Sequence, residues 1–269
     1  MKKRVISAAA LIAVLLVFML LSPISRLILF TAAAVLAVRE MVSVLSARGY
    51  SITAWPLYAY ITGHALIVYF EVGAVYAAAW FFFIAVISFA IAILGGINRA
   101  QDAVGAIFVL VYPLVPFAVI MYFAVHRAWP DIFLLGFLST WMCDAFAMFG
   151  GKWWGKHKAS PTVSPNKTIE GCASGAAFSV LGGVIVFFLL KVLPAPAVEL
   201  PLIACMVTAL VASTFGQFGD LAASLIKRMT GVKDYSNLIP GHGGMMDRVD
   251  SLLFSVPATF FCLFAFGLI

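Results

Sequence analysis

Charged residues are scarce in this sequence. Asp, Glu, Lys and Arg together make up 10% of the 269 residues, whereas soluble globular domains contain about 25%. Hydrophobic residues make up 64%, and the mean hydropathy is +1.09. Alternating segments of about ten residues, which are typical of outer-membrane barrels, are absent. The composition therefore excludes an ordinary soluble domain and predicts an all-α, polytopic integral membrane protein.

Cysteine is also scarce. Cys143, Cys172, Cys205 and Cys262 stand singly in apolar segments, without C-x-x-C spacing or a histidine cluster beside them. This spacing predicts neither a zinc site nor a disulfide framework. We interpret all four as small buried hydrophobic residues.

Nine apolar runs are long enough to suggest membrane-spanning helices. They cover residues 5 to 22, 26 to 46, 54 to 70, 73 to 95, 102 to 125, 130 to 150, 170 to 191, 198 to 222 and 249 to 269. The first run follows three basic residues as a signal peptide would, but it is long for one and no A-x-A cleavage site follows. We therefore expect it to be retained.

Basic residues predict the orientation, because Lys and Arg are retained on the cytoplasmic side. With nine spans, the face that holds the N-terminus carries thirteen basic residues: Lys2, Lys3, Arg4, Arg48, Arg99, Lys152, Lys156, Lys158, Lys167, Lys227, Arg228, Lys233 and Arg248. The other face carries three: Arg26, Arg127 and Lys191. We therefore expect a cytoplasmic N-terminus. The net charge of +6 indicates a preference for anionic lipid, not nucleic acid.

A few polar or helix-bending residues inside the apolar runs have structural explanations. Arg39 lies beside Glu40 in the second run, where snorkelling or structural pairing is expected. His64 is expected to be a hydrogen-bonded core residue. Pro113 and Pro116 should kink the fifth span because proline lacks an N–H and crowds the preceding turn.

The main polar stretch covers residues 224 to 250 and follows the eighth span. At 100° per residue, Asp220, Ser224 and Lys227 fall on one helical stripe, with Arg228 beside it. Asp247 and Asp250 mark the start of the ninth span. Carboxylate, hydroxyl and ammonium groups are therefore expected to face one site.

A second polar stretch precedes the seventh span. Residues 164 to 170 read as a helix entry in which Thr168 is the cap and Lys167 stands beside exposed backbone N–H groups. Such a helix start can receive a phosphate. Capping alone would explain Thr168, so both interpretations stay open for this loop.

The predicted topology places the ends of spans six and eight and the starts of spans seven and nine on one face. Seven residues can meet there: Asp144, Lys167, Asp220, Lys227, Arg228, Asp247 and Arg248. Carboxylates suit a magnesium ion that shares its ligands with substrate phosphates, and basic groups hold the phosphates. The residues alone thus predict a nucleotide or phospholipid transferase.

The two polar stretches resemble those of a known family, the phosphatidate cytidylyltransferases or CDP-diacylglycerol synthases. The first block consists of Ser224, Ile226, Lys227-Arg228, Lys233-Asp234, Ser236, Ile239-Pro240, His242-Gly243-Gly244, Met245 and Asp247-Arg248-Val249-Asp250. The second consists of Asp144, Gly151-Lys152, Gly155-Lys156, Ser164-Pro165-Asn166-Lys167-Thr168 and Glu170-Gly171. Together they cover about a quarter of the chain, and a signature of this length is far more specific than a lone glycine motif.

The resemblance implies the reaction of CTP with phosphatidate to give CDP-diacylglycerol and pyrophosphate, with Mg²⁺ required. It also implies a multi-pass protein of the inner membrane with its active site facing the cytoplasm. We divide the chain into scaffold helices (1–71), middle helices ending near Asp144 (72–150) and a catalytic region with two polar loops (151–269). A second cation and a homodimer are left open.

The resemblance and the predicted topology together give a set of candidate site residues. Catalytic roles are expected for Asp220, Asp247, Lys227, Arg228 and Arg248, with Asp220 and Asp247 as metal ligands. Substrate contacts are expected from Asp144, Ser164, Asn166, Lys167, Glu170, Ser224, Lys233, Asp234, His242, Gly243, Gly244 and Asp250.

Three other classes of membrane protein are weighed against this assignment. A secondary transporter would show repeats and charges at the membrane midplane, and neither is found. A CDP-alcohol phosphotransferase would need a D-G-x-x-A-R-type motif, which is absent. A polyprenol kinase is related in chemistry but is not expected to carry the full signature.

Overall fold

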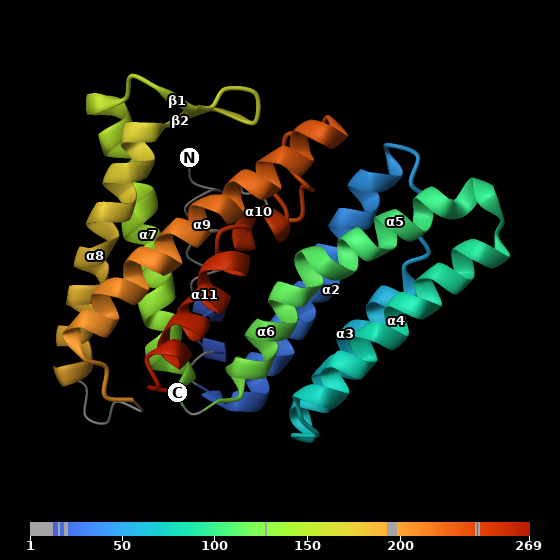
Figure 1. Cartoon of the computed structure of the whole chain (residues 1–269), viewed down its shortest axis with the longest axis horizontal. Helices are drawn as coiled ribbons and strands as arrows, with labels where there is room; N and C mark the ends of the chain where they lie inside the picture. Colours follow the sequence, from blue (N-terminus) through green and yellow to red (C-terminus); the bar gives the residue numbers. More distant parts are fainter. Residues whose placement is uncertain are drawn as a thin grey trace. The chain divides into compact units, whose positions relative to one another are not determined.

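A computed structural model describes residues 13–15, 17–18, 21–126, 128–192, 198–239, 241 and 243–269 (Figure 1). His242, one of the predicted substrate contacts, lies outside the described residues. The chain forms two compact units, Met1–His126 with Thr230–Arg248, and Arg127–Met229 with Val249–Ile269. We call them unit 1 and unit 2.

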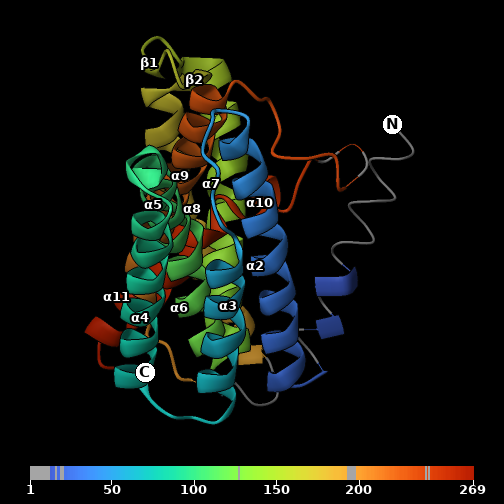
Figure 2. The same ribbon diagram turned by 90° about the vertical axis from the view of Figure 1, so that its right-hand side faces the viewer.

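Unit 1 is built from helices. They are α2 (Pro23–Ser46), α3 (Trp55–Tyr69), α4 (Ala74–Leu94), η1 (Ile97–Arg99), α5 (Ala100–Val109), η2 (Leu110–Leu114) and α6 (Val115–Ala124). Helix α2 packs on α3 and α6, and α3 packs on α4 (Figure 2). Ala34, Ala37, Val38 and Met41 of α2 are completely buried in this packing, so polar side chains on the same helical face need partners inside the unit.

Two local predictions for unit 1 are confirmed. The Nε2 of the buried His64 lies 3.0 Å from the carbonyl oxygen of Ala118. The fifth span is interrupted at Pro113, where Tyr112 leaves helical geometry with φ −134° and ψ 114°. The histidine is thus a hydrogen-bonded core residue, and the kink lies at Pro113, where proline removes an N–H from the helical ladder. No kink is seen at Pro116, which lies in the first turn of α6, where proline is tolerated.

Unit 2 contains α7 (Trp129–Trp154), a hairpin of β1 (Lys158–Ser160) and β2 (Ser164–Thr168), α8 (Ile169–Val192), α9 (Leu202–Thr230) and α11 (Leu252–Ala265). The short helix α10 (Met246–Val249) contains the boundary between the units. Helices α7 and α8 lie side by side (Figure 1). Helix α8 also contacts α9, where the hydroxyls of Ser179 and Ser213 are 2.8 Å apart.

Seven helical segments in the described part of the chain are long and apolar enough to cross a membrane. They coincide with seven of the nine expected runs and confirm a polytopic, all-α membrane protein. Helix α3, the third expected span, has 15 residues, and the first expected span falls mostly outside the described residues. The count of nine and the cytoplasmic N-terminus therefore stay predictions.

Glycines allow close approach of the unit 2 helices. A Cβ atom added to Gly175 of α8 would lie 2.6 Å from the carbonyl oxygen of Cys143 on α7, and one added to Gly182 would lie 3.2 Å from Cα of Ser139. In lipid, where hydrophobic burial gives little drive between helices, such backbone contact is a main source of packing energy.

We expect Gly175→Val to destabilise unit 2 by about 1–3 kcal/mol, because the added side chain would overlap the α7 backbone and force the helices apart. Ala173→Val is the matched control, since Ala173 is an exposed residue on the same helix. Thermal unfolding of the detergent-extracted proteins is the measurement. Equal midpoints for the two variants would contradict tight α7–α8 packing.

The β-hairpin was not predicted from the sequence. Lys158 pairs with Thr168 and Ser160 with Ser164 in an antiparallel register. The carboxylate of Glu170 accepts backbone hydrogen bonds from Lys156 at 3.1 Å and from His157 at 3.2 Å. The hairpin lies beyond the ends of α7 and α8 (Figure 1). It is stabilised by pairing between its two strands and by the Glu170 carboxylate of the following helix, and not by residues with a high strand propensity.

Candidate functional site

A polar cavity of about 370 Å³ opens in unit 2, where the end of α7, strand β2, the start of α8 and the later part of α9 meet. Its lining is Asp144, Ala147, Met148, Gly151, Lys152, Asn166, Lys167, Thr168, Gly171, Cys172 and Gln217. Three of the predicted site residues, Asp144, Asn166 and Lys167, are thus gathered around one space. Most of that second block faces this cavity.

An ion pair stands beside the cavity. Nζ of Lys167 lies 2.6 Å from Oδ2 of Asp220, and the two side chains are 23% and 31% exposed. Asp144 is accessible and interacts electrostatically with both of them. The structure thus brings together three of the seven residues that were predicted to meet, and the convergence of the full set stays a prediction. Lys167 was predicted as a phosphate anchor, and in the structure its ammonium group already has a carboxylate partner.

Thr168 is the cap of α8, as the sequence predicted. Its buried hydroxyl oxygen accepts a hydrogen bond from the backbone N–H of Gly171 at 3.1 Å. Glu170 in the first turn contacts Nδ1 of His157 at 2.6 Å in addition to the two backbone groups of the hairpin. Its carboxylate therefore supports the loop before β1, and a contact with substrate stays a prediction.

Helix α9 continues to Thr230, beyond the predicted end of the eighth span at residue 222. Asp220, Ser224 and Lys227 thus lie on one continuous helix, as the predicted stripe requires. Nε of Arg228 donates to the carbonyl oxygen of Val163 at 3.1 Å and so joins the end of α9 to the hairpin turn. This arginine has a protein contact where the sequence predicted a phosphate.

Asp250 lies next to the same part of α9. A side chain at Gly219 would overlap the Asp250 carbonyl oxygen, so α9 and the chain before α11 are in backbone contact. Oδ1 of Asp250 accepts the backbone N–H of Ser251 at 2.7 Å. Packing inside unit 2 therefore explains why the residue before Asp220 is a glycine, Gly219.

Two of the four cysteines are less buried than the sequence predicts. Cys143 and Cys205 are buried, but Cys172 and Cys262 are only half-buried, and Cys172 lines the cavity. The expectation that all four cysteines are buried is therefore wrong for these two. Sequence reasoning also missed Gln217, whose side-chain amide donates to the carbonyl oxygen of Cys172 at 3.1 Å and lines the cavity.

The other polar loop belongs to unit 1. We call residues 231 to 245 the signature loop. Oδ2 of Asp247 accepts backbone hydrogen bonds from Tyr235 at 2.9 Å and Gly244 at 3.0 Å, and the Asp247 residue is 9% exposed. The backbone N–H of Ile239 donates to the Gly243 carbonyl at 2.8 Å. Asp247 thus fixes two ends of a loop that has little regular structure.

The remaining predicted contacts in this loop differ in exposure. Lys233, Asp234 and Arg248 are exposed, whereas Gly244 is buried. Gly243 has φ +77°, a conformation that glycine adopts without strain. A Cβ atom at Gly243 would also lie 2.7 Å from Oδ2 of Asp247. Gly243 is therefore needed for the loop to close around the Asp247 carboxylate.

Glu40 is a residue that the sequence signalled but whose role was missed. An acidic residue inside an apolar span is costly and needs a partner, and Arg39 beside it suggested simple pairing. In the structure Glu40 is buried and Arg39 exposed. The described partners of Glu40 are Ser236, Met245 and Met246, all from the other polar stretch.

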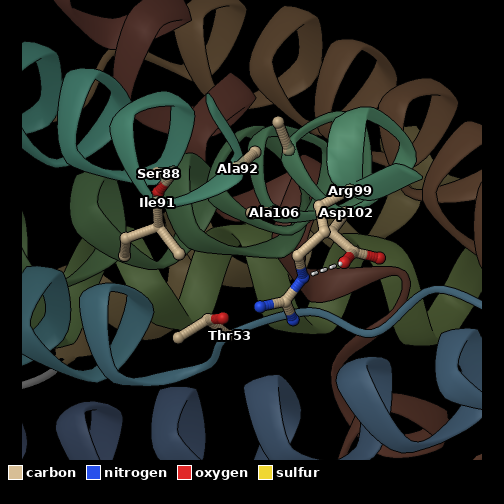
Figure 3. Close-up of a pocket in the computed structure, with 8 residues that line it drawn as sticks. Thr53, Ser88, Ile91, Ala92, Arg99, Asp102 and Ala106 are labelled. Carbon is tan, nitrogen blue, oxygen red and sulfur yellow. Dashed lines mark hydrogen bonds and ion pairs between the residues drawn. The ribbon is translucent and has the colours of Figure 1, made fainter. Parts of the chain in front are cut away.

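A second, much smaller cavity lies in unit 1 (Figure 3). Its volume of about 10 Å³ is enough for roughly one water molecule. Nε of Arg99 lies 3.0 Å from Oδ2 of Asp102, and Oδ1 of Asp102 accepts the backbone N–H of Ser51 at 2.6 Å. These contacts join the α2–α3 connection to the start of α5. The cavity is too small for a nucleotide.

The carboxylates beside the unit 2 cavity suit a magnesium ion better than a structural metal ion that is coordinated by protein side chains alone. Within the described part of the chain, no three His, Cys, Asp or Glu side chains are grouped so as to hold a metal ion. Mg²⁺ usually takes one or two carboxylates and completes its shell with water and substrate phosphates. The accessible carboxylates of Asp144 and Asp220, which flank a space with room for such a substrate, have this character.

A family model described as "Cytidylyltransferase family" matches residues 2–266. The chain belongs to this family. The match covers both polar stretches and nearly all the apolar helices, so family membership does not depend on the signature alone. The description of the family agrees with the family that the signature residues resemble.

Curated relatives give the same family. A phosphatidate cytidylyltransferase of Bacillus subtilis (strain 168) is 45% identical over 127 residues, which are 47% of this chain and 45% of the relative. One from Staphylococcus haemolyticus (strain JCSC1435) is 40% identical over 124 residues, which are 46% of this chain and 45% of the relative. The match thus spans a little under half the length of each of these relatives.

Proposed function

We propose that this cytidylyltransferase-family protein transfers CMP from CTP to phosphatidate and produces CDP-diacylglycerol and pyrophosphate. The observation that carries the proposal is the unit 2 cavity, where Asp144, Lys167 and Asp220 gather at the ends of apolar helices. The family match and the names of the two relatives support the same chemistry. A cavity of that volume beside membrane-spanning helices suits a nucleotide meeting a lipid headgroup.

In the proposed reaction, a phosphate oxygen of phosphatidate attacks the α-phosphorus of CTP, and the bond to the pyrophosphate oxygen breaks. A phosphate monoester is already ionised near neutral pH, since its second pKa is about 6. The protein therefore needs no strong general base. Its task is to hold two negatively charged reactants together and to stabilise the charge that moves to pyrophosphate.

We propose that Asp220, beside the unit 2 cavity, is a metal ligand, and that Asp247 is the second one, as the family signature implies. When bound, Mg²⁺ would neutralise phosphate charge and polarise the phosphoryl oxygens. Lys167 lies beside Asp220, and its ammonium group can also contact a phosphate. Arg228 and Arg248 are proposed as further phosphate anchors, because a guanidinium group binds phosphate at two points and is always charged.

We also propose that the site faces the cytoplasm. The excess of basic residues on the loops supports this orientation, since Lys and Arg are retained on the cytoplasmic side. In unit 2, the Lys167–Asp220 and Arg228–Val163 contacts bring the hairpin and the end of α9 to the same end of that unit. Both segments were assigned to one face by the predicted topology.

The test of the proposed function uses purified protein, phosphatidate in detergent micelles, Mg²⁺ and CTP labelled at either the α- or the γ-phosphate. We expect α-label to move into the organic phase and γ-label to stay in water as pyrophosphate. Diacylglycerol in place of phosphatidate is the matched control and should give no labelled lipid. Transfer of γ-label to lipid would indicate a kinase, and no lipid label at all would indicate a protein without this activity.

The same assay tests the orientation when it is run in sealed membrane vesicles, because CTP does not cross membranes. Inverted vesicles of cells that overproduce the protein should form labelled lipid from external CTP, above the level given by the Asp220→Asn variant. Activity confined to right-side-out vesicles would contradict a cytoplasmic site.

A further inference from the structure

Glu40 is a buried acid held by another part of the chain. It lies on α2, is 5% exposed, and accepts three hydrogen bonds from residues that the structure describes. The donors are the hydroxyl of Ser236 at 2.6 Å, the backbone N–H of Met245 at 2.9 Å and the backbone N–H of Met246 at 2.8 Å. All belong to unit 1 together with Glu40, and none is a cation.

The fit between Glu40 and the signature loop is close. A Cβ atom at Gly244 would lie 2.5 Å from both carboxylate oxygens of Glu40, so the loop backbone rests directly on the carboxylate. The N–H of this same Gly244 donates to Asp247. Gly244 is therefore held between two carboxylates, one from α2 and one from α10.

The two carboxylates fix both ends of the signature loop. At its beginning, the Tyr235 N–H donates to Asp247 and the Ser236 hydroxyl donates to Glu40. At its end, Gly244 donates to Asp247, while Met245 and its neighbour Met246 donate to Glu40. Turns and one isolated bridge are the only other regular features among the described loop residues, so these hydrogen bonds decide the shape of the loop.

We propose that Glu40 is a positioning residue: its carboxylate holds the signature loop closed and thereby orients Asp247 for the cytidylyl transfer. The effect on catalysis rests on the proposed function, whereas the effect on the loop does not. Each of the described partners of Glu40 is a hydrogen-bond donor, and an ionised carboxylate is a group that only accepts. Glutamine at this place would turn an NH₂ group toward at least one of these donors, so the charge-neutral replacement cannot restore all three contacts.

The loop itself gives the first readout. Lys233 is exposed, so limited trypsin cleavage after Lys233, followed by mass spectrometry of the purified protein, reports opening of the loop. We expect Glu40→Gln to raise this cleavage rate at least about threefold, while the thermal midpoint in detergent changes little. Glu71→Gln is the matched control, because Glu71 is an exposed carboxylate in the turn between α3 and α4, and it should match the wild type.

The second readout is kinetic. Removing a residue that orients a metal-binding group typically costs on the order of 10-fold to 100-fold, and we expect Glu40→Gln to lower kcat to this extent with a smaller change in KM for CTP. Ser236→Ala, which removes one of the three donors, should change both readouts in the same direction but less. If Glu40→Gln does not yield folded protein, Ser236→Ala decides.

The outcomes separate the two ideas. Glu40→Gln could be cleaved faster while even the wild type shows no cytidylyl transfer. That result would support Glu40 as the residue that holds the signature loop closed, which we call the Glu40 clamp, and would refute the proposed function. Wild-type cleavage rates in both variants would overturn the clamp, whatever the activity. A loss of kcat without loop opening would also overturn it, because Glu40 would then act by another route.

Discussion

Asp220→Asn is expected to reduce the rate of CMP transfer at least about 100-fold and to leave a folded protein. The substitution keeps the shape of the side chain but removes the charge that would bind Mg²⁺. Metal binding contributes several kcal/mol of transition-state stabilisation, and each 1.36 kcal/mol corresponds to a factor of ten. The amide oxygen can still accept a hydrogen bond from Lys167, which lies 2.6 Å from Oδ2 of Asp220, so unit 2 should keep its packing.

The measurement is the initial rate over a range of Mg²⁺ concentrations. If Asp220 binds the cation, the variant should need more Mg²⁺ for half-maximal rate. Glu199→Gln is the matched control, because Glu199 is an exposed carboxylate of unit 2 between α8 and α9. Its rate should equal the wild-type rate.

Lys167→Met separates metal binding from ion pairing. If Asp220 served only to orient Lys167, the two single variants and the double variant would lose the same activity, since residues that act as one unit are not additive. A further loss in the double variant would indicate separate roles. Near-normal activity of Asp220→Asn would contradict the metal assignment.

Local features of this chain could be read directly from its sequence. Thr168 caps α8, His64 is a bonded core residue and Pro113 marks a kink. Each depends on chemistry within a few residues or on one side chain in an apolar segment. The meeting of Asp144, Lys167 and Asp220 also followed, because helix topology decides which ends share a face.

Partners distant along the chain could not be read in the same way. Ser236 and Glu40 are 196 positions apart, and no local pattern shows which donors a buried acid will find. The hairpin was missed for a similar reason, since its strands are short and depend on Glu170 from the next helix. The sequence motifs predicted that Lys167 and Arg228 bind phosphates. A motif does not show which protein groups a side chain contacts, and in the structure Lys167 contacts Asp220 and Arg228 contacts Val163.

Asp247→Asn is expected to abolish measurable CMP transfer while the signature loop stays closed. Oδ2 of Asp247 accepts the N–H groups of Tyr235 and Gly244, and an asparagine amide oxygen can accept the same two. The loop contacts are thus weakened, because hydrogen bonds to a charged group are the stronger ones, but they are kept in number. The proposed metal ligand is lost, since an amide carries no charge to attract the cation.

Asp247→Ala provides the contrast that this argument needs. Alanine has no acceptor, so two backbone N–H groups in a buried site would lose their partner, at about 1–3 kcal/mol for each unsatisfied group. Trypsin cleavage after the exposed Lys233 should then be fast in Asp247→Ala and near the wild-type rate in Asp247→Asn, although both variants are inactive. Substantial activity in Asp247→Asn would mean that this carboxylate shapes the loop and binds no metal. Equally fast cleavage in both variants would mean that loss of the loop alone explains the loss of activity, because the charge of Asp247 would then be needed to keep the signature loop closed.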